Sequence, residues 1–157
     1  MEGKEPVDFR FGLAMKTNQD ELDDFENAFF YFVRALKVLG LPAEAQCEQM
    51  GNYNVSWELR HDASSGAMAV TEMATGRLTA EQSDRVAGLV SALADLPDEA
   101  IAPPGIRTDN HVGSLMAMRH ASWDPVRREA VNLLALLEST ILRNDRYFSG
   151  SALSADE

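Results

Sequence analysis

The longest regular hydrophobic pattern in the chain lies within residues 18–40. Apolar residues recur there every three or four positions, which places them on one face of an α-helix. Asn18 as N-cap, with Glu21 in a capping box, predicts the start of this helix, and Gly40 followed by Pro42 predicts its end. We therefore expect a core helix whose buried face contains Leu22, Phe25, Phe29, Phe32, Val33, Leu36 and Leu39.

Two shorter patterns follow, and the second is ambiguous. Pro42 at a first helical position and Gly51 bracket a short helix over residues 42–50. Residues 53–74 alternate at their start like a strand, but over their whole length the apolar residues recur with helical spacing. The helical interpretation accounts for more residues, and it puts Gly66 on the apolar face, where a small residue permits a close helix crossing.

The middle of the chain combines a clear helix with a long connection. Thr79 and Gln82 form a capping box at the start of a helix that ends before Pro97. Prolines, a glycine and acidic residues then indicate a loop over residues 97–110.

The C-terminal third is expected to contain two helices and a tail. A short helix covers residues 111–119. Asp124 as N-cap and Pro125 at the first helical position begin a longer helix that continues to about residue 143. Residues 151–157 have the composition of a disordered polar tail.

Residues 7–15 are the best candidate strand, because their apolar residues alternate with other positions. No second strand or hairpin turn accompanies them, so they form a short β-strand, an extended arm laid over helices, or a segment that pairs with another molecule. The prediction is a mainly all-α protein, with residues 1–150 forming a single-domain irregular bundle of about five helices.

The net charge of the chain favours some classes of binding partner over others. A formal charge of -11, from 25 acidic residues against 14 Lys and Arg, argues against nucleic acid, which is bound by clustered cations. It favours a basic partner protein, although net charge also serves solubility alone.

Compartment and cofactors are constrained by what the sequence lacks. Cys47 is the single cysteine, which excludes an intramolecular disulfide and a cysteine-based zinc cluster. The first residues lack a signal-peptide pattern, and no apolar run is long enough to span a bilayer, so we expect a cytoplasmic protein that does not enter the membrane. No nucleotide-binding motif or nucleophile elbow is present, and we expect no cofactor and no enzymatic activity.

The first helix offers the best candidate for a partner-binding face. Its acids crowd the first turns, as the helix macrodipole favours, but none has a basic residue four positions later to pair with. An exposed tyrosine beside them suits a contact patch. The predicted docking face consists of Asp20, Asp23, Asp24, Asn27 and Tyr31.

A metal site is the alternative chemistry. Glu58 and His61 have the Glu-x-x-His spacing that di-iron helical bundles use, and Asp62 adds a third ligand. The di-iron pattern needs a second such pair, which the chain lacks, so a solvated helix face is the favoured interpretation.

Residues 52–58 contain two asparagines beside Tyr53 and Trp57, a composition typical of recognition surfaces. The same composition fits a helix start whose rings enter the core, and we favour this structural interpretation.

Two segments, GNYNVSWELRHD and HASWDPVRREAVNLL, carry a general resemblance to another class of proteins. In a small acidic helical chain, they resemble bacterial immunity proteins, which protect a cell from a toxin. The resemblance contains no defining motif, so no functional residue is carried over. It implies tight binding to a toxin domain, often by covering the toxin's active site with acidic groups.

Three functional hypotheses follow from the sequence. The first is a non-enzymatic protein that binds and neutralises a basic partner through the first helix. The second is a metal-binding or di-iron-like helical enzyme that uses Glu58 and His61. The third is a regulatory adaptor that forms a homodimer through residues 7–15.

Overall fold

The computed structural model describes residues 17–74 and 76–156, with side chains as far as residue 150. This part of the chain contains eight helices and no strand, which confirms the mainly all-α prediction. The number of helices is larger than the predicted five. They are α2 (Asn18–Leu39), α3 (Ala43–Met50), α4 (Val55–Glu72), α5 (Ala80–Ala94), α6 (Asp98–Ile101), α7 (His111–Met118), α8 (Trp123–Leu136) and α9 (Glu138–Asp156).

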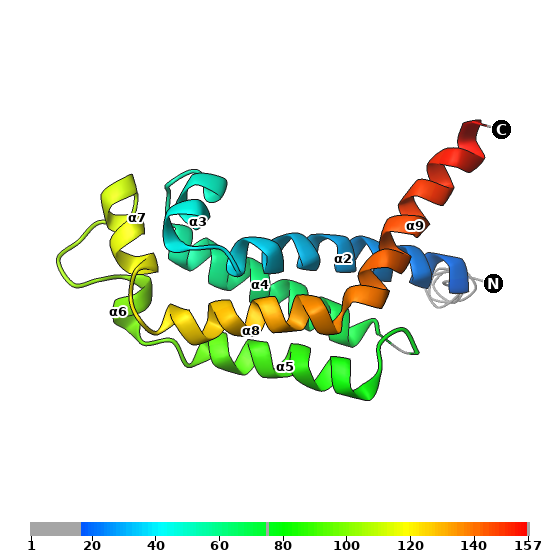
Figure 1. The fold of residues 1–157 in the computed structure, drawn as a ribbon, viewed down its shortest axis with the longest axis horizontal. Helices are drawn as coiled ribbons and strands as arrows, with labels where there is room; N and C mark the ends of the chain where they lie inside the picture. Colours follow the sequence, from blue (N-terminus) through cyan, green and yellow to red (C-terminus); the bar gives the residue numbers. More distant parts are fainter. Residues whose placement is uncertain (1–16, 75, 157) are drawn as a thin grey trace, which may run out of the picture.

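Four long helices build the body of the molecule. Helix α2 packs on α4 and α8, and α5 packs on the same two helices from the other side, so α2 and α5 lie diagonally opposite (Figure 1). The short helices α3, α6 and α7 close one end of this bundle, while α9 leaves the other end beside the start of α2.

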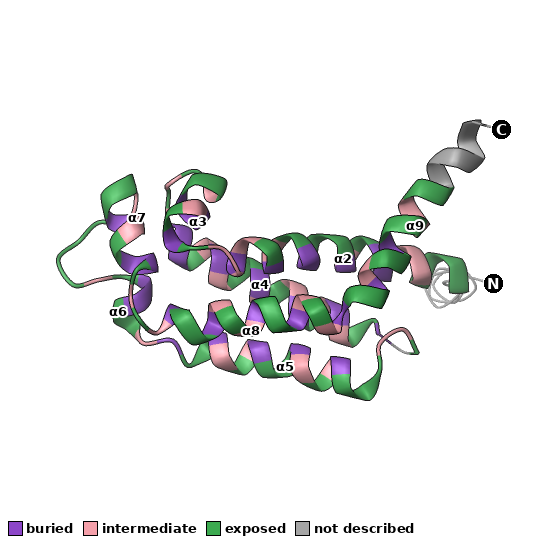
Figure 2. Cartoon of the chain, in the orientation of Figure 1, coloured by how far each residue is buried: buried purple, intermediate pink, exposed green. Residues whose placement is uncertain are grey.

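The core lies between these four helices, as the purple positions in Figure 2 show. Phe25, Phe29 and Phe32 of α2 are fully buried, together with Leu89 of α5 and Leu133 of α8. Burial of large side chains is the main favourable contribution to folding, at about 1.5–3 kcal/mol for each one. The predicted apolar face of residues 18–40 is thus confirmed as the centre of the core, except for Leu22, which is only partly buried.

The start of α2 differs from the prediction by one residue. Thr17, not Asn18, is the N-cap: its backbone is extended and its hydroxyl accepts a hydrogen bond from the Asp20 amide at 3.0 Å. The Asp20 carboxylate in turn accepts from the Thr17 amide, which completes the capping box. Glu21 is therefore not the capping carboxylate.

The predicted loop over residues 97–110 contains a short helix that is held by hydrogen bonds from distant side chains. Helix α6 lies inside the predicted 97–110 loop, and two of its carbonyl oxygens accept hydrogen bonds: that of Ala100 from the Trp123 indole, and that of Ile101 from the Ser56 hydroxyl. The predicted loop is therefore only partly irregular.

The predicted helix over residues 124–143 is in fact two helices. The first, α8, begins at Trp123 after Ser122, so Asp124 lies inside it and is not the N-cap. It ends at Leu136, whose carbonyl accepts a hydrogen bond from the Gln82 side chain of α5 at 3.2 Å. The chain turns at Leu137 and continues as α9 toward α2.

Three predictions concern the ends of the chain. The strand or arm at residues 7–15 lies outside the described residues. Helix α9 continues through residues 151–156, where a polar tail was expected, and the division of the chain at residue 150 stays a prediction. No helix in the described part of the chain is both long enough and apolar enough to span a membrane.

The crossing of α2 and α4 depends on Gly66, and this gives a testable prediction. A Cβ atom at Gly66 would lie 3.3 Å from the Phe32 Cα atom, whereas one at Gly88 of α5 would meet nothing within 4 Å. We expect Gly88→Ala to raise the free energy of unfolding by about 0.5–1 kcal/mol, because alanine favours helix. Gly66→Ala should lower it by about 1–3 kcal/mol through overpacking. Urea denaturation of both variants measures these changes, and equal gains would show that the crossing is not tight.

Candidate functional site

The predicted docking face lies on the outer side of α2. Asp20, Asn27 and Tyr31 are exposed there, and Asp23 and Asp24 are partly exposed. Tyr31 keeps 63% of its surface accessible, so it does not serve the core. The structure thus places all five predicted residues on one surface.

The expectation that these acids are unpaired is wrong: the Asp20 carboxylate accepts a hydrogen bond from the Thr17 amide, and Asp23 also has partners. Its carboxylate accepts hydrogen bonds from the Gln19 side chain, at 2.9 Å, and from the Tyr147 hydroxyl of α9. Beside it, buried Glu26 accepts a hydrogen bond from Asn144 of α9 at 2.6 Å. Asp23 and Glu26 therefore hold α9 against α2, and Asp23 has a structural role in addition to its charge.

Aromatic rings continue this surface along α2. Phe30 makes edge contacts with Tyr31 and with Phe148 of α9, at centroid distances of 5.3 and 5.5 Å. The Arg34 guanidinium lies over the Phe30 ring at 5.8 Å from its centroid. A cation over a ring is stabilising by about 0.5–1 kcal/mol at exposed sites.

A groove of about 780 Å³ runs between α2 and α4, next to this surface. Small residues are part of its lining, including Ala28 and Ala35 of α2 and Gly66 of α4. Polar side chains stand around it, and the α2 side carries the cations: the groove is lined by Tyr31, Arg34, Lys37, His61, Asp62 and Ser65 among others. The sequence did not indicate this groove, because it depends on how two helices cross.

The metal alternative finds no support in the described residues. Among them, no group of three or more His, Cys, Asp or Glu side chains could hold a metal ion, so Glu58, His61 and Asp62 do not form such a site. His61 is instead stacked on the Trp57 ring, with centroids 5.1 Å apart and planes 5° from parallel.

The aromatic residues around the start of α4 were assigned to the wrong environment. Tyr53 and Trp57 are 55% and 52% exposed, so their rings do not enter the core as we expected. Trp57 begins an exposed row on α4 with His61 and Met68. Of this row only His61 also lines the α2 and α4 groove with Tyr31, whereas Trp57 lines a separate hollow beside Ala94 at the end of α5.

The remaining histidines have local roles. The His111 ring is hydrogen-bonded to the Asn52 side chain at 2.8 Å, and the His120 ring accepts from the Ser122 amide at 3.1 Å. Neither is arranged with a nucleophile in the described contacts.

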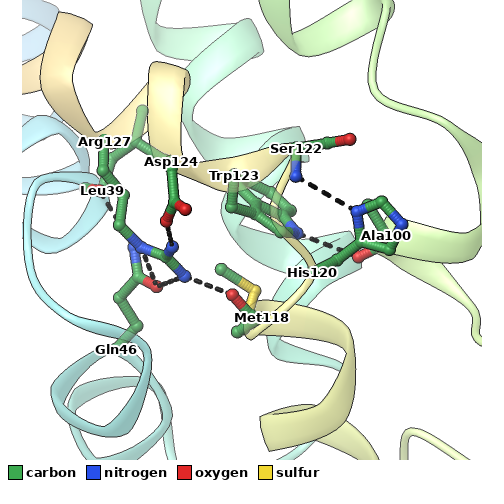
Figure 3. Close-up of polar contacts among 9 residues, drawn as sticks. All are labelled: Leu39, Gln46, Ala100, Met118, His120, Ser122, Trp123, Asp124 and Arg127. Carbon is green, nitrogen blue, oxygen red and sulfur yellow. Dashed lines mark hydrogen bonds and ion pairs between the residues drawn. The ribbon is translucent and has the colours of Figure 1, made fainter.

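A buried polar junction joins α3, α7 and α8 at the closed end of the bundle (Figure 3). Arg127 donates to the Gln46 side chain, to Asp124 and to the Met118 carbonyl, while Gln46 donates to the Leu39 carbonyl. Burial lowers the pKa of the Arg127 guanidinium, and Asp124 opposes that shift. Every buried side-chain nitrogen and oxygen in the described part of the molecule has a partner. The hydrogen bonds of the junction therefore connect α3, α7 and α8.

Cys47 lies beside this junction and is fully buried. Burial, and to a smaller extent the nearby Glu44 carboxylate, raise the pKa of its thiol. Because the thiolate is the reactive form, the structure disfavours a catalytic role for this cysteine.

We predict that Arg127→Met lowers the free energy of unfolding by about 1–3 kcal/mol, because the Gln46 and Met118 oxygens lose their buried donor. Arg128 is the matched control: it is exposed on the next position of α8, and Arg128→Met should change stability by less than about 0.5 kcal/mol. Thermal and urea unfolding of the two variants provide the comparison. Equal losses would show that the junction contributes no specific stability.

The two tryptophans give a second prediction. Trp57→Ala should change the free energy of unfolding by less than about 1 kcal/mol, because the ring is half exposed. Trp123→Ala should cost about 3–5 kcal/mol, because this ring is fully buried and its indole N–H is hydrogen-bonded. A comparable loss for both variants, measured by urea denaturation, would place Trp57 in the core and remove it from the surface.

No protein-family model, curated protein or solved structure matches this chain. Its function must therefore be inferred from its own surface. The best-supported site is the outer face of α2, with Tyr31 at the edge of the α2 and α4 groove.

Proposed function

We propose that this chain is a non-enzymatic protein that binds a basic partner protein through the outer face of α2. The observation that carries the proposal is the exposure of Tyr31 beside acidic residues and at the edge of a groove. A large aromatic side chain left 63% exposed contributes little to the fold. At an interface the same ring provides a large contact area and a hydroxyl group.

Electrostatics supports a basic partner. The chain has a formal charge of -11, and acids occupy the first turns of α2 ahead of Tyr31. Opposite charge on a partner raises the association rate and disfavours wrong partners. Burial of Tyr31 against the partner would then provide the short-range contribution that slows dissociation.

The resemblance to bacterial immunity proteins adds a specific version of this proposal. In that version the partner is a toxin domain, which is neutralised when this acidic surface covers it. A cytoplasmic location is part of the same proposal, and a chain whose single cysteine is free and buried suits a reducing compartment. The alternative of a homodimeric adaptor built on residues 7–15 concerns residues outside the described part.

Site-specific photocrosslinking in the source cells tests the proposal. A photoreactive phenylalanine analogue replaces Tyr31 in one variant and Tyr53 in the matched control, since both tyrosines are more than half exposed. We expect the Tyr31 variant to give one discrete adduct with another protein of net positive charge. The Tyr53 variant, whose probe lies in the turn before α4, should not give it.

A second substitution in the variant with the photoreactive residue at position 31 tests whether negative charge on α2 contributes to partner binding. Asp24→Lys should lower the yield of the adduct, and more so at low salt, because exposed charges are screened over about 8 Å at physiological ionic strength. Asp84→Lys makes the same charge change on α5, diagonally opposite α2, and should leave the yield unchanged. Equal adducts from both tyrosine positions, or an acidic partner, would contradict the proposed docking face.

A further inference from the structure

The groove between α2 and α4 has an apolar lining that a ligand can reach. Its apolar side chains come from three helices and include Val38 of α2, Met50 of α3 and Ala69 of α4, all partly exposed. Its volume of about 780 Å³ lies in the range of about 300–1,000 Å³ that is usual for ligand pockets. The groove can therefore hold a small molecule that has an apolar part.

Both cations of α2 line the same groove. Arg34 and Lys37 lie three residues apart on consecutive turns of the helix, and both are exposed. Neither makes an ion pair with another residue whose side chain is described. In a chain whose net charge is -11, the groove thus contains two positive charges that are available to an anion.

A neighbouring ring restrains one of these cations. The Arg34 guanidinium lies over the Phe30 ring, 5.8 Å from its centroid. A guanidinium on the face of a ring keeps its N–H donors, which lie in its own plane, for another acceptor. Because Arg34 is already restrained, it loses less conformational freedom when it binds a ligand.

Further hydrogen-bond donors and one acid complete the polar lining. Tyr31 lies one turn before Arg34, and Ser65 lies on α4, so each wall also has a hydroxyl group that can donate a hydrogen bond. Among the described residues of the lining, Asp62 is the one acid, and it makes no ion pair with either cation of α2. The cations outnumber this acid, so the groove favours a negative group over a positive one.

We propose that the groove binds an amphipathic small molecule with one carboxylate group and an apolar tail. Arg34 and Lys37 hold the carboxylate, because a guanidinium fork matches its two oxygens and an ammonium group adds a second positive charge. The tail lies against the apolar lining, where it is removed from water. The inference goes beyond the proposed function, since it concerns a small molecule in the groove and not a basic protein on the acidic turns of α2.

The net charge of the chain limits how much negative charge the ligand carries. At -11, the chain repels anions at long range, and this repulsion grows with the charge of the anion. Nucleic acids and other polyanions therefore fit the groove poorly, whereas a single carboxylate is repelled least. The apolar tail is needed as well, because exposed ion pairs alone contribute little binding energy.

Isothermal titration calorimetry of the full chain with three probes tests the class of ligand. Octanoate has both parts, octan-1-ol has a tail without the charge, and acetate has the carboxylate without the tail. We expect octanoate to bind with one-to-one stoichiometry and at least about tenfold more tightly than either of the other probes. Amide NMR spectra recorded during the titration should show the largest shifts at groove residues such as Ala35, Gly66 and Ala69.

Substitution of the two cations tests where the carboxylate binds. Arg34→Gln with Lys37→Gln should weaken octanoate binding at least about tenfold, because the negative charge loses both partners. Arg128→Gln with Arg146→Gln removes the same charge from exposed positions of α8 and α9, and it should leave the affinity unchanged within about twofold. Circular dichroism of each variant reports whether its helices remain folded.

The acid in the lining gives a test of opposite sign. Asp62→Asn should strengthen octanoate binding by about twofold to fivefold, because it removes a negative charge beside the bound carboxylate. Damage to the groove would weaken binding, so a gain in affinity is specific to the change of charge. Unchanged or weaker binding by the folded variant would place the carboxylate elsewhere.

Three further results would overturn the inference. The first is the absence of saturable octanoate binding up to about 10 mM. The second is equal affinity for octanoate and octan-1-ol, which would make the groove an apolar surface that does not select charge. The third is an equal loss of affinity in the α2 variant and its control, which would assign the effect to net charge alone. All of these measurements use the chain without a protein partner, so they leave the proposed function to its own crosslinking test.

Discussion

The packing of α2 against α4 is the constraint on which the rest of the molecule depends. The aromatic face of α2 is buried to completion at Phe25, Phe29 and Phe32, and Gly66 lets α4 approach the Phe32 backbone. Because close-packed helices cannot rotate freely about their axes, this contact also fixes which side of α2 faces outward. The exposure of Tyr31 and the direction of its acidic neighbours are thus consequences of the core.

Several residues on that outer face have structural roles within the chain, whether or not a partner binds there. The acids in the first turns interact favourably with the helix macrodipole, and each stabilises the helix by about 0.3–1 kcal/mol at exposed sites. Asp20 completes the N-terminal cap, and Asp23 holds Tyr147 of α9. Tyr31 has an edge contact with Phe30 and little else to explain its exposed position. It is therefore the residue on this face whose exposed position is least explained by contacts within the chain.

Much of the fold could be predicted from the sequence, because several helix ends are marked by capping residues close to them in the sequence. The capping box of Thr79 and Gln82 is one example, and the predicted boundary agrees with the structure. The break between α8 and α9 could not be predicted, because it accompanies a hydrogen bond from Gln82 to a carbonyl far away in the sequence. The same holds for α6, which is fastened by Trp123 and Ser56. For the site, helical periodicity correctly predicted that Tyr31 is exposed. The groove and the exposure of Trp57 could not be predicted, because they depend on how separate helices pack.

The polarity of α2 connects its stability with its choice of partner. Acids near the N-terminus and cations near the C-terminus are what the macrodipole favours. The first turns carry Asp20, Glu21, Asp23 and Asp24, whereas the second half of the helix offers Arg34 and Lys37. The acids of α2 therefore outnumber its two cations, and under the proposed function this excess of negative charge would face the basic partner.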